Sequence, residues 1–289
     1  MAMKYHSRSI SLPSRSHPTT IKVDEELNKL KTWEATSTPT SNSVHTGLSL
    51  LEGVYISLDQ LLHMSSIQLA ISQHQAHNCV EELLDGSVRV LDICGITRDI
   101  LLQIKENVEA LHSAVRRRKG DSSVEKSVAE YKFFTKKMKK NVKTLVTELK
   151  HMETRFGVYP LLNLDDQMAS VIRVIREAIL MNTSIFQSLL DFLVIPKEAT
   201  KCFVVARWMH KGTLEACEDH NSEMVNELKS VDLVLDCVVS EGGCLEKMKI
   251  VHTRLEALKM AIETLENGLH VVFRRLIKTR ASLLNIISQ

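Results

Sequence analysis

Apolar residues recur at three- and four-residue steps along most of the chain after Thr46, which is the spacing of amphipathic helices. The most regular run lies near the C-terminus and consists of Met248, Val251, Leu255, Leu258, Ile262, Leu265, Leu269, Val272 and Leu276. Such a seam is typical of coiled coils, so it either packs inside a bundle or joins two copies of the chain. We expect it to pack within the chain, because other helices of similar length are available there. A homo-oligomer through the C-terminal helix is the alternative.

Prolines, glycines and capping residues divide this pattern into separate helices. The first predicted helix covers residues 47–64, and a capping-box spacing between Ser122 and Glu125 opens a later one. Asn163 starts another helix, and Pro196 suits the first turn of the one that follows. A break or kink is predicted at the Asp85-Gly86-Ser87 triplet, and the other predicted breaks lie, in chain order, at Gly120, the segment from Gly157 to Pro160, Pro196 and the Gly242-Gly243 pair.

The first 45 residues have a different character. Three of the five prolines (Pro13, Pro18 and Pro39) lie there among many serines and threonines, with one short amphipathic stretch, "VDEELNKLKTW". We therefore predict a flexible, disordered tail over residues 1–45 that carries a short helix, followed by a helical bundle over residues 46–289. The predicted fold class is all-α, an elongated multi-helix bundle with long antiparallel helices.

Composition supports this fold and removes several functional classes. Hydrophobic residues make up 44% of the chain but aromatic residues only 4%, so the core must be aliphatic, as between helices. The net charge of +2 gives no global attraction to nucleic acid or membranes. Six cysteines without a C-x-x-C pair, and the lack of a secretory signal at the start, favour a cytoplasmic protein with reduced, mostly buried thiols. The most apolar stretch, "AILMNTSIFQSLLDFLVI", contains Asn182, Gln187 and Asp191, which indicates a buried helix.

Three collinear stretches carry a resemblance to a known family. They are "SLPSRSHP" near the N-terminus, "ELLDGSVRVLDIC" in the centre and "RRLIKTRASLLNIISQ" at the C-terminus. Together they resemble the plant BYPASS-type proteins over nearly the whole chain. The resemblance implies a land-plant protein with an all-helical fold and a place in root and shoot development, and it implies no catalytic residues. One departure is visible after Leu61-Leu62, where relatives often have a proline-containing turn and this chain has "HMSS", so the helix break expected near Met64 is open.

Catalytic and metal-binding patterns are missing from the sequence. His74, His77 and Cys79 lie close together, as do Cys217 and His220, but neither group has the second pair of ligands that tetrahedral zinc requires. No G-x-S-x-G, G-x-G-x-x-G or Walker motif occurs. We therefore expect a protein that is not an enzyme and has no cofactor and no bound metal.

A basic stretch, "YKFFTKKMKKNVKTLVTELKHMETRF", is the strongest local signal in the bundle. On a helix, an apolar stripe of Phe134, Met138, Val142, Leu145, Leu149, Met152 and Phe156 faces away from Lys132, Lys136, Lys139, Lys140 and Lys143. This lysine face is either a solvated back face or a surface for anionic lipid. No aromatic residue is expected among the lysines to stack on bases, so no nucleic acid partner is expected. Together with the segment from Arg116 to Lys119, the lysines also fit a nuclear localisation signal.

The stretch "RSISLP" fits the pattern R-S-x-S-x-P, which resembles the phosphoserine ligand of 14-3-3 proteins. Arg8 suits a basophilic kinase, Ser11 is the phosphorylated position, and Ser9 and Pro13 complete the pattern. Protein partners, among them 14-3-3, are therefore expected. The first 22 residues also contain Lys4, Arg15 and no acid, which is the composition of a plastid or mitochondrial transit peptide, so import is an alternative.

Overall fold

The structure, a computed structural model, describes residues 18–73, 78–117, 121–156, 161, 164–194, 226–241 and 245–288. The helices of this described part are α1 (Ile21–Thr36), α2 (Ser41–Leu62), α3 (Ser65–Gln73), α4 (Asn78–Arg117), α5 (Asp121–Arg155), α6 (Asp166–Val194), α8 (Glu227–Glu241) and α9 (Leu245–Ile287). No strand occurs among the described residues. The predicted all-α class is confirmed.

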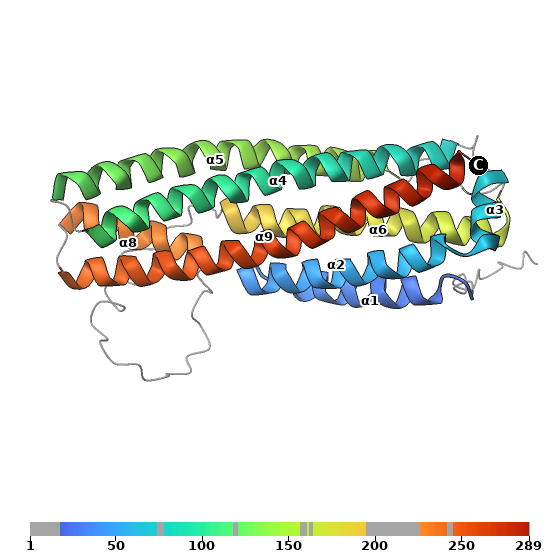
Figure 1. The fold of residues 1–289 in the computed structure, drawn as a ribbon, viewed down its shortest axis with the longest axis horizontal. Helices are drawn as coiled ribbons and strands as arrows, with labels where there is room; N and C mark the ends of the chain where they lie inside the picture. Colours follow the sequence, from blue (N-terminus) through green and yellow to red (C-terminus); the bar gives the residue numbers. More distant parts are fainter. Residues whose placement is uncertain are drawn as a thin grey trace, which may run out of the picture.

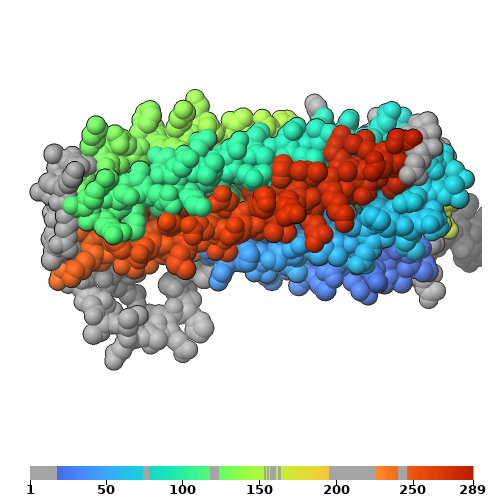
Figure 2. Space-filling model, in the orientation of Figure 1, coloured from blue at the N-terminus to red at the C-terminus, as the bar shows by residue number. Residues whose placement is uncertain are grey.

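The helices form an elongated bundle whose long members run side by side along its length (Figure 1). The C-terminal helix α9 packs against α4, α2 and α8, while α6 packs against α1, α2, α4 and α5. The space-filling view shows α9 as a continuous band between α4 and the pair α1 and α2 (Figure 2). The two long helices α4 and α9 therefore form one side of the bundle. Helix α6 packs its apolar side chains into the core from the other side.

The C-terminal seam is buried inside this bundle. Eight of its nine residues are at most 3% exposed, and Met248 is half-buried against the same core. The aliphatic pattern thus has its partners within the chain, on α2, α4 and α8, which confirms the intramolecular interpretation of the seam. Self-association through these side chains would require the bundle to open, because eight of the nine are buried.

Helix α1 corrects the predicted boundary between tail and bundle. Its apolar side chains Val23, Leu27, Leu30 and Trp33 are all at most 8% exposed and belong to the same core as the long helices. The short helix predicted in "VDEELNKLKTW" is present, but it is packed against α2 and α6 and is not part of a flexible segment. Of the predicted tail, residues 18–45 are therefore structured, and residues 1–17 lie outside the described part.

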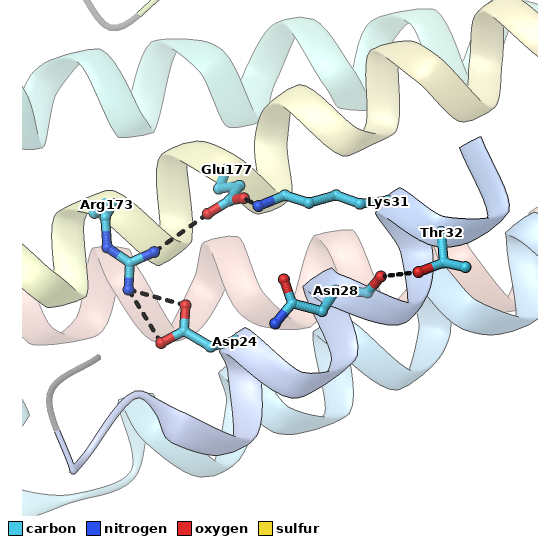
Figure 3. A network of polar contacts seen from close by, with 6 residues as sticks. All are labelled: Asp24, Asn28, Lys31, Thr32, Arg173 and Glu177. Carbon is cyan, nitrogen blue, oxygen red and sulfur yellow. Dashed lines mark hydrogen bonds and ion pairs between the residues drawn. The ribbon is translucent and has the colours of Figure 1, made fainter. Parts of the chain in front are cut away.

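Polar contacts fix α1 to α6 beside this apolar contact (Figure 3). Arg173 on α6 donates from Nη2 to both carboxylate oxygens of Asp24 at 2.9 and 3.0 Å, and from Nη1 to Glu177 at 3.3 Å. Glu177 also pairs with Lys31 of α1. Two oppositely charged pairs thus set the register of α1 along α6.

The predicted break at Asp85-Gly86-Ser87 is wrong, because α4 is a continuous helix from Asn78 to Arg117. Gly86 lies inside it and serves close packing: a β-carbon at this position would lie 2.4 Å from Cε2 of Phe156. A glycine in a helix interior lowers helix stability, but it lets the Phe156 ring approach the backbone. Gly86 therefore marks a close side-chain contact and not the end of a helix.

Most other predicted helix ends are confirmed. The open question near Met64 is settled as a break, since α2 ends at Leu62 and α3 begins at Ser65. Helix α5 ends at Arg155, just before Gly157. Helix α6 begins at Asp166 and is capped by Asp165, which accepts a hydrogen bond from Met168 N at 2.6 Å, so the start predicted at Asn163 is two residues too early. Helix α8 ends at Glu241 and α9 begins at Leu245, while the Gly242-Gly243 pair expected to form the turn and the helix expected after Pro196 both lie outside the described residues.

Candidate functional site

The predicted lysine face of α5 is divided by the structure into two groups. Lys132 and Lys139 turn toward α8, where their Nζ atoms lie 2.6 Å from Asp236 Oδ1 and 2.8 Å from Asp232 Oδ2. Lys136, Lys140 and Lys143 are exposed. The expectation of one five-lysine face is therefore wrong, because two of the five join α5 to its neighbour.

The predicted apolar stripe of α5 is confirmed. Met138, Val142, Leu145, Leu149 and Met152 are buried, and Phe134 and Phe156 are partly buried against the core. The apolar face of α5 is thus fully used in packing the bundle.

An exposed aromatic residue lies among the free lysines, contrary to the expectation from sequence. The side chain of Phe133 is 74% exposed, the highest value among the large hydrophobic residues described. Positions three, four and seven residues further on are Lys136, Lys137 and Lys140, so all four side chains share one face of the helix. We call Phe133, Lys136, Lys137, Lys140 and Lys143 the α5 ridge.

The ridge is the one exposed stretch of α5 that combines a large apolar group with several cations. The structure gives its four lysines no ion pair with another described residue. No acidic residue lies in the sequence between Glu130 and Glu148. Sequence reasoning missed Phe133 because its neighbour Phe134 belongs to the buried stripe; the helical angle of Phe133, close to that of Lys137 and Lys140, was the signal that could have found it.

A polar cavity lies where α2, α8 and α9 meet. It has a volume of about 130 Å³ and is lined by Thr40, Asn226, Glu227, Ser230, Arg254 and Ala257. Ser41 donates a hydrogen bond to Glu227, while Glu227 Oε2 and Ser230 Oγ are buried without a hydrogen-bond partner among the described residues. Sites for small molecules usually measure about 300–1,000 Å³, so this cavity has room for a few waters or a very small ligand.

The described cysteines are buried free thiols, as the sequence predicts. Cys79, Cys94 and Cys237 form no disulfide among the described residues. Burial raises the pKa of the Cys94 thiol to about 12, and it also raises the pKa of Cys79. A thiol that stays protonated at neutral pH is a poor nucleophile.

Two histidines and a glutamate meet between α4 and α9, although 140 residues of sequence separate the first two. The rings of His112 and His252 have their centroids 4.4 Å apart, and Glu256 Oε2 lies 3.7 Å from His252 Nδ1. Burial lowers the pKa of His112, and the neighbouring His252 lowers it further. No local spacing in the sequence pairs His112 with the other two.

Most of the remaining sequence candidates lie in parts of the chain that the structure does not describe. Arg8, Ser9, Ser11 and Pro13 lie outside the described residues, as do His74, His77, Cys217 and His220, while Cys79 is buried in α4. Phosphorylation of Ser11 stays a prediction. No helix in the described part of the chain is long and apolar enough to cross a membrane.

Comparison with protein families gives one match. The model of the family described as Protein BPS1 matches residues 47–286, which run from α2 to the end of α9. Neither the comparison with curated proteins nor that with solved structures found a match. The chain therefore belongs to the BPS1 family, and the resemblance seen in its sequence is confirmed. Helix α1 precedes the matched range, although it is packed into the same core.

Proposed function

We propose that this BPS1-family protein is a non-catalytic helical interaction protein that acts in plant root and shoot development. Family membership supports the developmental role. The observation that carries the interaction role is the α5 ridge, where Phe133 and four lysines are presented to solvent. The small volume of the cavity and the protonated state of Cys94 at neutral pH favour binding over catalysis.

The chemistry of the ridge defines the partner it would bind. A protein segment with acidic side chains and one apolar side chain would match four cations around an aromatic ring. Exposed aromatic residues supply much of the binding energy in protein interfaces, because they bury a large area with few rotatable bonds. The lysines would mainly steer association and set its specificity.

A membrane surface is the second candidate partner of the same ridge, favoured by its net positive charge. A helix that lies in the membrane interface needs a broad apolar face to insert. In α5 that face consists of side chains such as Val142 and Leu145, which are already buried in the bundle. Phe133 alone remains for insertion, so a protein partner fits the ridge better than lipid does.

The test compares two variants of the full chain in affinity purification from root tissue. The ridge variant carries Phe133→Ala with Lys136, Lys137, Lys140 and Lys143 changed to Gln. A control variant carries Lys126→Gln and Lys150→Gln, two exposed lysines of the same helix outside the ridge. We expect the ridge variant to lose specific protein partners and the control to keep them. Equal recovery of partners by both variants would contradict the role of the ridge.

Vesicles with and without anionic lipid separate the second candidate. Electrostatic attachment to anionic lipid falls as salt rises, and each lysine near the surface contributes about 1 kcal/mol. If the ridge binds membranes, the wild-type chain should sediment with anionic vesicles at low salt, and the ridge variant should stay in solution. Loss of protein partners without vesicle binding favours the first candidate.

Phosphorylation of the N-terminal segment is the proposed means of control. A phosphate on Ser11 adds about 1.5 to 2 negative charges and can be held bidentately by arginines, as in a 14-3-3 groove. Ser11 precedes the first residue of α1 by ten positions, which span at most about 36 Å when fully extended. Because α1 is packed on α6, a 14-3-3 dimer bound at Ser11 would be held near that end of the bundle.

A peptide from Arg8 to Pro18 tests this control directly. Binding to a plant 14-3-3 protein is measured with the peptide phosphorylated at Ser11, unmodified, and changed to Ala at Ser11. We expect binding by the phosphorylated form alone. Equal binding of all three forms, or removal of this segment during organelle import, would exclude the proposed control.

A further inference from the structure

The α4–α9 contact brings three potential metal ligands together on the surface of the bundle. His112 comes from α4, and His252 and Glu256 come from α9, one helical turn apart. One ligand atom from each of the three lies within 4.8 Å of the other two. Residues at i and i+4 share one face of a helix, so His252 and Glu256 both point toward the His112 ring across the interface.

The three side chains also have their ligand atoms available. His112 Nε2 is buried and has no hydrogen-bond partner among the described residues. A buried polar atom without a partner destabilises the fold, and a bound ligand would remove this cost. Two cations, Lys259 and Arg116, act on His112. Lys259 Nζ lies 3.0 Å from Glu109 Oε1, and neither cation forms an ion pair with Glu256 in the described part of the chain. Glu256 is exposed, with 57% of its side chain accessible, and can turn toward an ion.

We propose that His112, His252 and Glu256 form a binding site for a divalent transition-metal cation, with Zn²⁺ as the best match. Two imidazole nitrogens and one carboxylate oxygen are a donor set that zinc accepts, with bonds of about 2.0–2.2 Å. With bonds of that length and tetrahedral angles the ligand atoms lie roughly 3.3–3.6 Å from one another, so small side-chain rotations would close the present separations of at most 4.8 Å. Three protein ligands leave a fourth position open for water.

Such a site would connect α4 and α9 near the end of α4, where Arg116 and Arg117 follow. A cation that binds the folded bundle but has no preformed site in the unfolded chain stabilises the fold. Sequence inspection expects no metal in this protein because it can compare only ligands that are close in sequence. The present site depends on the antiparallel register of two long helices, which places residue 112 opposite residues 252 and 256.

Zinc binding to the chelator-treated full chain is measured by calorimetry at neutral pH. We expect one equivalent to bind in the wild type. His112→Gln, His252→Gln and Glu256→Gln should each weaken binding at least about tenfold, because loss of even an outer-shell partner commonly costs 10–100-fold. His270→Gln removes an exposed histidine of the same helix and should leave zinc affinity unchanged.

Cobalt identifies the ligands and separates this site from binding by the cysteines. Co²⁺ held by two histidines and a carboxylate shows visible bands without the strong sulfur-to-metal charge-transfer absorption of thiolate ligands. Thermal unfolding with and without zinc then measures the connection between α4 and α9, and we expect a higher Tm with zinc in the wild type and in His270→Gln only.

The proposal is overturned if the wild type binds no zinc, if His252→Gln and Glu256→Gln bind as tightly as the wild type, or if cobalt gives a thiolate spectrum. The last result would assign the metal to cysteines elsewhere in the chain. His252 and Glu256 lie on the exposed side of the contact, so their variants keep the test valid should His112→Gln fold poorly.

Discussion

Substitution of Trp33 by alanine should show whether α1 is a structural part of the bundle. Trp33 is 8% exposed and donates a hydrogen bond from Nε1 to the carbonyl oxygen of Ser43 at 2.8 Å. Gly47, on the next helix, makes room for the ring: a β-carbon there would lie 2.5 Å from Cζ2 of Trp33 and 2.6 Å from Cδ1 of Ile185. Trp33 therefore occupies a slot that a larger residue at position 47 would fill.

The magnitude follows from the buried area. A tryptophan that buries about 200 Å² contributes about 5 kcal/mol at about 25 cal/mol per Å². Alanine keeps part of this contribution, and measured Trp→Ala substitutions in cores cost about 3–5 kcal/mol. We expect Trp33→Ala to lower the free energy of unfolding by that amount. Trp33→Phe, which keeps a ring and loses the N–H donor, should cost about 1 kcal/mol for the hydrogen bond, plus a smaller packing loss.

A double-mutant cycle with Gly47→Ala makes the prediction specific to this contact. Alone, Gly47→Ala should cost about 1–3 kcal/mol by overpacking against the Trp33 ring. In the Trp33→Ala background it should cost less, because the closest atom has been removed and only Ile185 still crowds the new methyl group. Urea unfolding followed by far-ultraviolet circular dichroism gives the free energies of unfolding of the wild type, the two single variants and the double variant. Glu25→Ala, at an exposed position of α1, is the control, and its cost should be near zero. Equal costs of Gly47→Ala in both backgrounds, or a Trp33→Ala cost near zero, would refute the packing described for α1.

Three other predictions follow from the described contacts. Limited proteolysis should leave a resistant fragment that begins close to residue 18 and retains α1; a stable fragment beginning near residue 46 would contradict the packing of Val23, Leu27 and Leu30. Arg176→Ala should cost about 3–5 kcal/mol in urea unfolding, because it removes the cation whose Nη2 lies 2.5 Å from Oε2 of Glu82, a carboxylate side chain that is only 8% exposed. Arg176→Met with Glu82→Leu should cost much less; equal losses in both variants would exclude this explanation. Cys94 should resist alkylation at pH 8 in the native protein and react in urea, since burial raises its pKa to about 12; rapid native labelling, measured by mass spectrometry, would show that α4 opens readily.

Helix ends were predictable where the chain carries a local stop signal. Gly157 and Pro160 follow the end of α5, and Asp165 caps α6 two residues after the predicted Asn163, so short-range chemistry located those boundaries closely. At Gly86 the same kind of signal misled, because a glycine in a helix can serve close packing as well as a break. Only the position of Phe156, 70 residues further along the chain, distinguishes the two.

The error at α1 came from weighting composition above periodicity. Prolines and serines on both sides of "VDEELNKLKTW" are typical of a flexible segment, whereas Val23, Leu27, Leu30 and Trp33 already have the spacing of a buried helical face. The site formed by His112 and His252 could not be found in this way. It depends on the register between two helices, and nothing close to His112 in sequence pairs it with His252 and Glu256.

The lysines of α5 show why a surface cannot be assigned from one helix alone. On a helical wheel Lys132 and Lys139 belong to the same face as Lys136 and Lys140. Helix α8 presents Asp236 and Asp232 to the first pair, whereas the second pair has no ion-pair partner within the described part of the chain. Asp232 and Asp236 lie one turn apart on α8 and can therefore face the same neighbouring helix. The sequence shows which lysines they pair with only once the contact between α5 and α8 is known. Neutralising all the lysines of α5 together would loosen the α5–α8 contact as well as remove the free charges. A loss of partners in that variant would therefore have two explanations, whereas the ridge variant, which keeps Lys132 and Lys139, has one.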